Sequence, residues 1–410
     1  MKLPDLGNPD FYVDGFPHEL FVRLRREEPV AWCDEPASGD FPGGTGFWVL
    51  TKHADVSFAG KNPQIFSSHA GGTFIRDLGD KLLREQQRAM LSTDPPEHAT
   101  LRKIVSRAFT PRMVAGMRAS MEAHADNVVD ALGDGGDLDL VDRFSAEMPI
   151  LVLADILGMP SEDRRLLYDW TNRMVGGGDP TAGADPKAYA SAFIELFGYA
   201  AELTKAKRAN PGDDVWSMVV NAEVDGERLS DEDLNRFFQL LVIAGNETTR
   251  NLLTGSVLLL SQHPGQWREL RANPDLLNPA IEEVLRFHSP VTQFRRTAVQ
   301  DVEIRGTRIK SGDKVVLCYA SANRDEDVFA DPGTFDITRT ENPHLAFGSG
   351  QHFCLGNAVA RLEARVILPK LFERFRTIEV TGPPVRQRAN FINGITELPV
   401  RLSTRAPARV

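Results

Sequence analysis

The sequence predicts a mainly α-helical protein with small β sheets. Apolar residues recur at helical spacing from about residue 94 to residue 290, for example in LRKIVSRAF and MEAHADNVVDAL. The runs FWVL (Phe47 to Leu50) and VEIRGTRIKSGDKVVLCYAS indicate short strands and small antiparallel pairs. With 410 residues, 42% of them hydrophobic and 25% charged, the chain is neither disordered nor fibrous.

We expect a single domain over residues 1–410, because no Ser/Gly-rich or acidic linker divides the chain. Residues 1–60 and 291–340 are the predicted β-containing parts, and residues 94–290 and 355–376 are the predicted helical parts. A Gly- and Pro-rich connection from Arg173 to Pro186 separates two helical patterns and has the composition of a flexible hinge.

Charge and cysteine content exclude several classes of protein. The net charge of −10 argues against nucleic acid or an anionic membrane as a partner. The three cysteines are too few for a disulfide framework and lack the paired spacing of a zinc site. The first residues lack the apolar core of a signal peptide, and no run of roughly 18 apolar residues exists to cross a bilayer. We therefore expect a cytoplasmic protein without stable membrane insertion.

Three helix boundaries are marked in the sequence. Ser230 begins a capping box, and the helix that it opens meets no proline until Pro264, about 30 residues or on the order of 45 Å later. Asp94, Pro95 and Glu97 signal another helix start, which places His98 and Arg102 on one face. Asn278-Pro279 begins a third helix, which carries Glu283 and Arg286 one turn apart.

The segment FGSGQHFCLG, Phe347 to Gly356, carries the candidate reactive group. Its glycines allow a tight loop, and Cys354 directly precedes the last predicted helix. A helix start favours an anionic sulfur, which is a soft ligand for iron or a nucleophile. The alternative from the residues alone is a buried structural thiol. No GxxxxGK[ST] motif or βαβ glycine fingerprint indicates a nucleotide.

The pattern FxxGxHxCxG of this segment resembles the haem-binding loop of the cytochrome P450 family. The resemblance implies that Cys354 is the axial ligand of haem iron, that Phe347 packs near it, and that Gly350 and Gly356 allow close backbone approach. Cys33 and Cys318 have no companion pattern, and we expect them to be inert.

The middle of the long helix, AGNETTRN, resembles the oxygen-activating segment of the same family. The resemblance implies that Ala244 and Gly245 leave room for dioxygen, while Thr248 and Glu247 form a hydrogen-bonded path for protons. From the residues alone, a threonine hydroxyl that bonds back to a carbonyl one turn earlier is the alternative.

Glu283 and Arg286 match the ExxR motif of the family, which implies a buried structural pair behind the haem. The family often adds an arginine in a PxRF-like segment, where this chain has PGTF with Thr334. The triad is therefore either incomplete or completed by Arg339.

The resemblance further implies that four donors hold the haem propionates: His98, Arg102, Arg296 and His352. Two anionic propionates require such a convergence. Since Arg295 adjoins Arg296, either arginine is a candidate for this role.

By the same resemblance, the fold is a triangular helical prism that encloses haem b (iron protoporphyrin IX) and the protein is a monooxygenase acting with O₂. The chain has no flavin, nicotinamide or iron–sulfur motif, which implies that electrons come from a ferredoxin with its reductase. Four arginines are candidates for attracting this acidic carrier: Arg107, Arg112, Arg361 and Arg365.

The predicted substrate pocket is apolar, which favours a hydrophobic small molecule. Its candidate lining residues are Leu240, Ile243, Ala244, Val291, Phe294 and Ile392. Several segments resemble actinobacterial members that hydroxylate steroid side chains or methyl-branched lipids at a terminal carbon. Terpenoids or a macrolide-type secondary metabolite are the alternative substrates, and a haem-thiolate sensor or binding protein is the alternative class. A peroxide-driven enzyme is a further alternative, whereas a Cys/His hydrolase finds no oxyanion arrangement.

Overall fold

A computed structural model of the chain describes residues 2–38, 41, 43–174 and 185–404. The helices are α1 (His18–Glu27), α2 (His53–Lys61), α3 (Asp80–Gln87), α4 (Glu97–Ser106), α5 (Pro111–Gly116), α6 (Arg118–Asp130), α7 (Glu147–Leu157), α8 (Arg164–Met174), α9 (Pro186–Ala209), α10 (Val215–Val220), α11 (Asp231–Gln262), α12 (Pro264–Ala272), α13 (Leu277–His288), α14 (Tyr319–Ala322) and α15 (Asn357–Arg374). Within this part of the chain, no helix is long and apolar enough to span a bilayer. Most of the predicted hinge from Arg173 to Pro186 lies outside the described residues.

The strands form four small sheets. They are β1 (Val30–Cys33), β2 (Phe47–Leu50), β3 (Phe66–Ser67), β4 (Gly135–Asp139), β5 (Gln293–Ala298), β6 (Val302–Ile304), β7 (Thr307–Ile309), β8 (Lys314–Cys318), β9 (Thr377–Val380), β10 (Val385–Arg386), β11 (Ile395–Glu397) and β12 (Pro399–Ser403). The largest sheet has the order β1-β2-β8-β5-β3, in which only β2 and β8 run parallel. The other sheets have the orders β4-β12-β9, β6-β7 and β10-β11.

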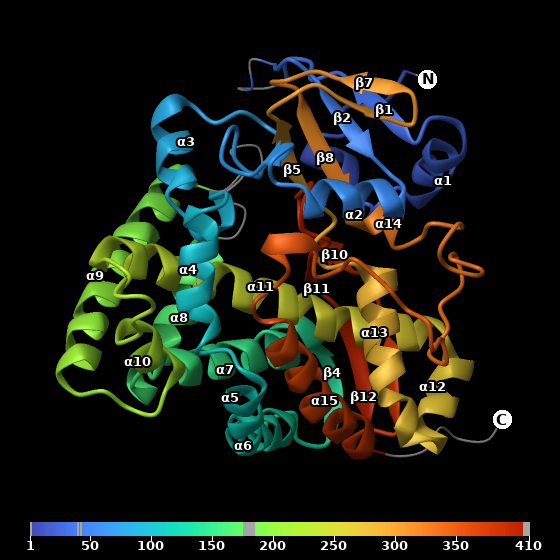
Figure 1. The fold of residues 1–410 in the computed structure, drawn as a ribbon. Helices are drawn as coiled ribbons and strands as arrows, with labels where there is room; N and C mark the ends of the chain where they lie inside the picture. Colours follow the sequence, from blue (N-terminus) through green and yellow to red (C-terminus); the bar gives the residue numbers. More distant parts are fainter. Residues whose placement is uncertain (1, 39–40, 42, 175–184, 405–410) are drawn as a thin grey trace.

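Helix α11 runs across the middle of the molecule, with the five-stranded sheet above it and α15 beside it (Figure 1). Its 32 residues begin as predicted, because the Ser230 side chain accepts a hydrogen bond from the Asp233 N–H. One large apolar core surrounds α11, and two smaller cores cover the two faces of the five-stranded sheet.

The predicted strand at Phe47 to Leu50 and the strands of the 302–318 segment are confirmed. Arg305 and Gly306 form the tight turn between β6 and β7 with φ of 51° and 77°. The N-terminal part is more helical than the sequence indicated, since α1, α2 and α3 precede residue 94. Strand β4 also interrupts the segment predicted to be helical, because it pairs with β12 from the distant C-terminal part.

Candidate functional site

The loop that carries Cys354 is closed by its own backbone. The Cys354 N–H donates to the Phe347 carbonyl at 2.9 Å, and Gly348 and Gly350 adopt φ of 73° and 70°. The side chain of Asn357, the first residue of α15, donates to the Cys354 carbonyl at 2.8 Å. The sulfur is therefore held at the start of α15 as predicted.

Gly350 allows a close backbone approach, but toward α2. A Cβ atom at Gly350 would lie 2.1 Å from the Gly60 carbonyl oxygen, so the loop rests directly on the end of α2. Gly356 has φ of −83°, and no described atom lies within 4 Å of its Cβ position. A role of Gly356 toward a cofactor stays a prediction.

The protein surroundings leave the Cys354 thiol protonated at neutral pH. Burial raises its pKa, and this outweighs the opposing effects of the Gly356 N–H, Arg102 and Arg361. A bound metal cation deprotonates a thiol outright. The described residues hold no group of three His, Cys, Asp or Glu that could bind a metal ion.

The surroundings of the two other cysteines, Cys33 and Cys318, disfavour the reactive thiolate form. Burial raises the pKa of both Cys33 and Cys318 to about 12. Both are fully buried and unpaired. At neutral pH each is a protonated thiol that packs in the core.

Glu283 and Arg286 form a fully buried pair with 0% exposure. Their side chains are joined at 2.6 and 2.7 Å, and Arg286 also donates to the Thr334 carbonyl at 3.0 Å. Arg339 donates to the Glu283 carboxylate at 3.2 Å, and the Asn342 amide donates to it at 3.1 Å. Arg339 therefore completes the triad, which settles the alternative that Thr334 left open.

A second pair ties the cysteine loop to α13. The Arg361 guanidinium stacks on the Phe347 ring at 4.4 Å from its centroid. The same group pairs with Glu282 of α13, with Nε at 2.6 Å from Oε1. The Phe347 ring is therefore held against α15 by Arg361, and its carbonyl is bonded to the Cys354 N–H. Phe347 thus lies near Cys354, as predicted.

His98, Arg102, Arg296 and His352 converge in the structure. The rings of His98 and His352 lie 4.2 Å apart, and Arg102 donates to the Phe353 carbonyl, next to Cys354, at 2.7 Å. Burial, together with the nearby charges of Arg102 and Arg296, lowers the pKa of His98 to about 4 and that of His352 to about 2. The sequence indicated that Asp94 opens this helix, but its carboxylate instead binds Ser67 and the Ser68 N–H.

The donors of this cluster lie near the Asp94 carboxylate, which opposes the lowering by burial of the pKa of His98 and of Arg296 but is itself bound to Ser67 and the Ser68 N–H. None of the four members of the cluster forms an ion pair with a carboxylate among the described residues, although Arg296 is only 4% exposed. A buried guanidinium without a counter-ion is costly, so the cluster fits an anionic ligand such as the propionates of haem. Ser68, which lies 3.1 Å from His352, is a further polar neighbour that no sequence signal revealed.

Arg295 is engaged elsewhere. Its guanidinium pairs with Asp77 at 2.7 Å and donates to the Ile75 carbonyl at 3.2 Å. Arg296, on the opposite face of β5, acts on the histidine pair. The geometry therefore favours Arg296 over Arg295 as the propionate ligand.

Helix α11 has an open face at its middle. Ile243, Ala244 and Gly245 are exposed, although Val242 before them and Asn246 after them are buried. A Cβ at Gly245 would meet only one described atom within 4 Å, a methyl group at 3.8 Å. These three residues are therefore the part of α11 that the described protein atoms leave accessible.

Thr248 and Glu247 lie next to this open face. The Thr248 hydroxyl donates to the Ala244 carbonyl at 2.7 Å, which is the local bond that the sequence left as an alternative. Glu247 is buried, and its carboxylate accepts from Arg250 at 2.7 Å. Burial raises the pKa of Glu247 more than Arg250 lowers it, so this carboxyl retains a proton more readily than an exposed one.

Aromatic side chains from three distant segments meet near the predicted substrate residues. Phe294 stacks on Phe391 at 6.5 Å, and Phe391 meets Phe74 edge-on at 5.0 Å. Phe391 and Phe74 were not predicted. Phe391 neighbours the predicted Ile392, but nothing in the local sequence around Phe74 indicates its position.

The other predicted substrate residues divide between two places. Leu240 packs against the large core, and Ile243 is 40% exposed on the open face of α11. Val291 and Ile392 pair through a backbone bridge. Ile392 is buried and lines a small pocket with Tyr12 and Phe16, and its contact with a substrate stays a prediction.

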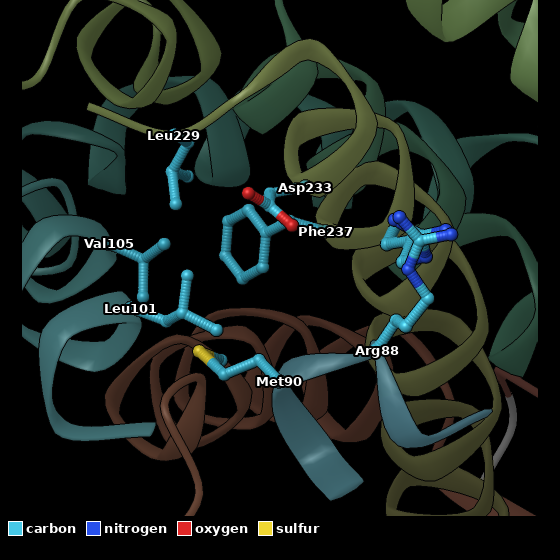
Figure 2. A pocket seen from close by; sticks show the side chains of 8 residues that line it. Arg88, Met90, Leu101, Val105, Leu229, Asp233 and Phe237 are labelled. Atoms are coloured by element: carbon cyan, nitrogen blue, oxygen red, sulfur yellow. The ribbon is translucent and has the colours of Figure 1, made fainter. Parts of the chain in front are cut away.

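A separate small pocket lies between α4 and the start of α11. Figure 2 shows Met90, Leu101, Val105, Leu229 and Phe237 facing one another across it, with Asp233 at its edge and Arg88 to one side. None of the predicted site residues lines this pocket.

The four arginines proposed for a partner are unequally available. Arg361 is committed to Glu282, Arg365 donates to the Arg361 carbonyl at 3.2 Å, and Arg107 donates to the Glu223 carbonyl at 2.7 Å. Arg112, at the start of α5, is exposed.

Comparison with known proteins gives consistent matches. Residues 181–402 match the family model described as Cytochrome P450. The linalool 8-monooxygenase of Pseudomonas putida is 40% identical, with 98% of this chain and 99% of the relative covered. A methyl-branched lipid omega-hydroxylase of Mycobacterium tuberculosis is 42% identical, with 97% and 94% covered. A steroid C26-monooxygenase of Rhodococcus jostii is 37% identical, with 98% and 85% covered.

A solved structure matches over the same range. A Mycobacterium marinum cytochrome P450 in complex with pseudoionone has a TM-score of 0.86 and 38% identity, with 93% of this chain and 94% of that chain covered.

Proposed function

Because the chain belongs to the cytochrome P450 family and is a haem-thiolate monooxygenase, we propose that it hydroxylates the terminal carbon of a methyl-branched apolar chain. The branched chain is that of a lipid or of a steroid side chain. The reaction consumes O₂, two electrons, two protons and the substrate, and it yields the alcohol and water.

The observation that carries this proposal is the apolar character of the open region. Ile243 and Ala244 on α11 present no charge there, and the cluster of Phe74, Phe294 and Phe391 supplies aromatic surface. Such walls bind by burial of apolar area, about 25 cal/mol per Å². The lipid and steroid hydroxylases among the relatives support the same substrate class.

We propose haem b as the cofactor. The residue cluster of His98, Arg102, Arg296 and His352 suits two propionates, and Cys354 suits the iron. The chain lacks the C-x-x-C-H sequence that attaches haem covalently, since its three cysteines are far apart. When bound, the haem iron supplies the activation of dioxygen.

The protein supplies protons and excludes water. We infer that Glu247 gives a proton to the Thr248 side, where the hydroxyl of Thr248 aligns it toward dioxygen. The raised pKa of Glu247 means that this carboxyl holds a proton more readily than an exposed glutamate, as a proton donor requires.

Thr248→Ala and Glu247→Gln test this assignment. Each should lower the product formed per electron consumed and release the remainder as peroxide, because a positioned general acid contributes roughly 100-fold or more to proton transfer. Unchanged coupling in both variants would remove the proposed role, and an unchanged spectrum of the haem protein is the control for intact structure.

We propose a ferredoxin with its reductase as the electron donor and the cytoplasm as the location. The exposed guanidinium of Arg112 supports an acidic carrier, whereas the internal bonds of Arg361 remove it from the predicted set. Arg112→Glu should slow the rate at which a reduced ferredoxin reduces the protein, because a favourable charge is replaced by an unfavourable one. The decrease in rate should be largest at low salt, where charges are least screened.

Optical titration tests the substrate. Cholest-4-en-3-one and a methyl-branched fatty acid should each displace water from the site and produce a low-to-high-spin shift, and the products should carry a terminal hydroxyl by mass analysis. No shift with either compound contradicts the substrate class.

Terpenoids are the second candidate substrates. The linalool 8-monooxygenase and the pseudoionone complex among the matches favour them. A shift with linalool but not with the two lipids would select this candidate.

A further inference from the structure

Phe74 differs from the two other rings of the aromatic cluster in how its backbone is held. Phe294 belongs to β5, and the Phe391 carbonyl accepts a hydrogen bond from the Thr292 N–H, directly before β5, at 2.8 Å. Phe74 instead lies in the irregular segment 71–77, which connects β3 to α3 (Figure 1). The place of the Phe74 ring against Phe391 therefore depends on what holds this segment.

The side chain and the backbone of Arg295, in β5, hold the segment at several points. The Nη1 atom of Arg295 donates to the Ile75 carbonyl at 3.2 Å and to the Asp77 carboxylate at 2.7 Å. The same atom lies 3.5 Å from the Phe74 carbonyl oxygen. The Arg295 N–H donates to the Thr73 carbonyl at 2.8 Å. One residue of the sheet therefore binds the segment both before and after Phe74.

Gly71 leaves the space that the Arg295 guanidinium occupies. A Cβ atom at Gly71 would lie 2.2 Å from Nη2 of Arg295 and 2.6 Å from Oγ1 of Thr297. The guanidinium is thus packed directly against the start of the segment, and Arg295 is only 4% exposed. A side chain at residue 71 would displace the guanidinium from this position.

Asp77 attaches the other end of the segment to two strands. Its carboxylate pairs with Arg295 of β5 and with Lys314 of β8, whose Nζ atom lies 2.5 Å from Oδ2 of Asp77. The side chains of both cations are buried, whereas that of Asp77 is 51% exposed. Because a buried cation is costly without a partner, the two cations hold Asp77 at the sheet.

We propose that Arg295 is a positioning residue for the substrate, which holds the segment 71–77 so that Phe74 stands against Phe391 as one wall of the substrate pocket. The inference rests on the proposed function, in which the aromatic cluster binds the apolar substrate. Arg295 acts through Phe74 and not by contact with the substrate. Two adjacent residues of β5, Arg295 and Arg296, then serve the substrate pocket and the anion-binding cluster respectively.

Two variants disturb the attachment and retain the buried Arg295. Gly71→Ala displaces the guanidinium by steric contact, and Asp77→Asn removes the ion pair. Asp301→Asn is the matched control, because it makes the same change in an ion pair of similar length, with Arg308 at 2.6 Å beside the β6–β7 hairpin. The side chain of Asp301 is 48% exposed, close to the value for Asp77.

The first measurement is hydrogen exchange of the Arg295 amide in the substrate-free holoenzyme. Since this N–H is bonded to the Thr73 carbonyl, a loosened segment should let it exchange about tenfold faster in Gly71→Ala and Asp77→Asn than in the parent. The Asp301→Asn control should exchange as the parent does. Equal exchange in all four proteins refutes the attachment, whatever the substrate is.

The second measurement is optical titration of the holoenzyme with cholest-4-en-3-one, in the parent and in a Phe74→Ala background. In the parent background, Gly71→Ala and Asp77→Asn should raise the Kd roughly three- to tenfold, because the Phe74 ring no longer covers the ligand. In the Phe74→Ala background the same changes should leave the Kd nearly unaltered, since Arg295 acts through this ring. Equal factors in both backgrounds indicate a general structural effect and refute the positioning role.

The titrations also separate this inference from the proposed function. If Phe74→Ala weakens binding while Gly71→Ala and Asp77→Asn bind as the parent does, the positioning role is refuted and the proposed function stands. The same holds if Phe74→Ala itself binds as the parent does. If the parent shows no spectral shift with cholest-4-en-3-one, a methyl-branched fatty acid or linalool, the proposed substrates fail and the positioning role fails with them.

Discussion

Two parts of the site are held by different forces. We call the region of the Cys354 loop and the Glu283 network the cysteine side, and the region around the β10–β11 hairpin and Phe391 the hairpin side. On the cysteine side, directional bonds to charged groups fix the structure: Glu283, with 0% exposure, receives bonds from Arg286, Arg339 and Asn342. On the hairpin side, Phe74, Phe294 and Phe391 meet through aromatic contacts, and Gln387 keeps an unpartnered oxygen. Directional bonds define one position for a sulfur, whereas apolar contacts accept substrates of varied shape.

Replacement of Cys354 tests the cysteine side most severely. Cys354→Ser should abolish monooxygenase activity, because a serine hydroxyl is not a thiolate ligand. The protein should still bind haem through the cluster of His98, Arg102, Arg296 and His352. The measurement is the carbon monoxide difference spectrum, in which the long-wavelength thiolate band should disappear. Persistence of that band in Cys354→Ser would identify another ligand.

Loss of Glu283 should have the next largest effect. Glu283→Ala leaves the Arg286 guanidinium buried without its partner, which costs about 3–5 kcal/mol of stability. Denaturant unfolding of the holoprotein measures this loss. Glu282→Ala is the control, since Glu282 is partly exposed and its removal should cost clearly less. Equal losses in the two variants would contradict the central place of Glu283.

The hairpin side should respond to acid through His288. Burial, together with Arg386, lowers the pKa of this histidine from 6.5 to about 3. Below pH 6.5 the unfolded chain therefore takes up a proton that the folded protein refuses, and stability falls by about 1.4 kcal/mol per pH unit until the pKa near 3 is reached.

His288→Gln removes this titration while it retains hydrogen-bonding atoms. Its unfolding free energy should be flatter between pH 6.5 and pH 3 than that of the parent. Urea unfolding at several pH values provides the comparison. The same pH slope in both proteins would show that His288 is not the group responsible.

The smallest effect is expected for the aromatic cluster. Phe391→Ala should weaken binding of the branched substrate roughly tenfold, because the ligand loses apolar contact worth about 1–2 kcal/mol. Ile392→Ala should change substrate affinity less, since Ile392 lines the other pocket. Optical titration of both variants ranks them, and a larger loss for Ile392→Ala would reverse the assignment of these neighbours.

The two sides also differ in how well the sequence predicted them. Three features are local patterns in the sequence: the segment FGSGQHFCLG, the capped helix from Ser230 and the Glu283–Arg286 pair. The mainly helical P450 fold, the buried pair and the anion-binding cluster were therefore predicted. Arg339 remained an alternative, because its contact with Glu283 spans 56 residues. Phe74 was missed, since its contact with Phe391 depends on tertiary packing between segments without a shared pattern.

The Glu283 network also bears on the loop that carries Cys354. The Glu283 carboxylate accepts hydrogen bonds from the Asp336 N–H, Arg339 and Asn342. The segment 334–342 is therefore held in place by a side chain of α13. That segment leads directly into the cysteine loop. The position of the cysteine loop therefore depends on how α13 is docked, so that a change at Glu283 also disturbs the loop that carries the sulfur.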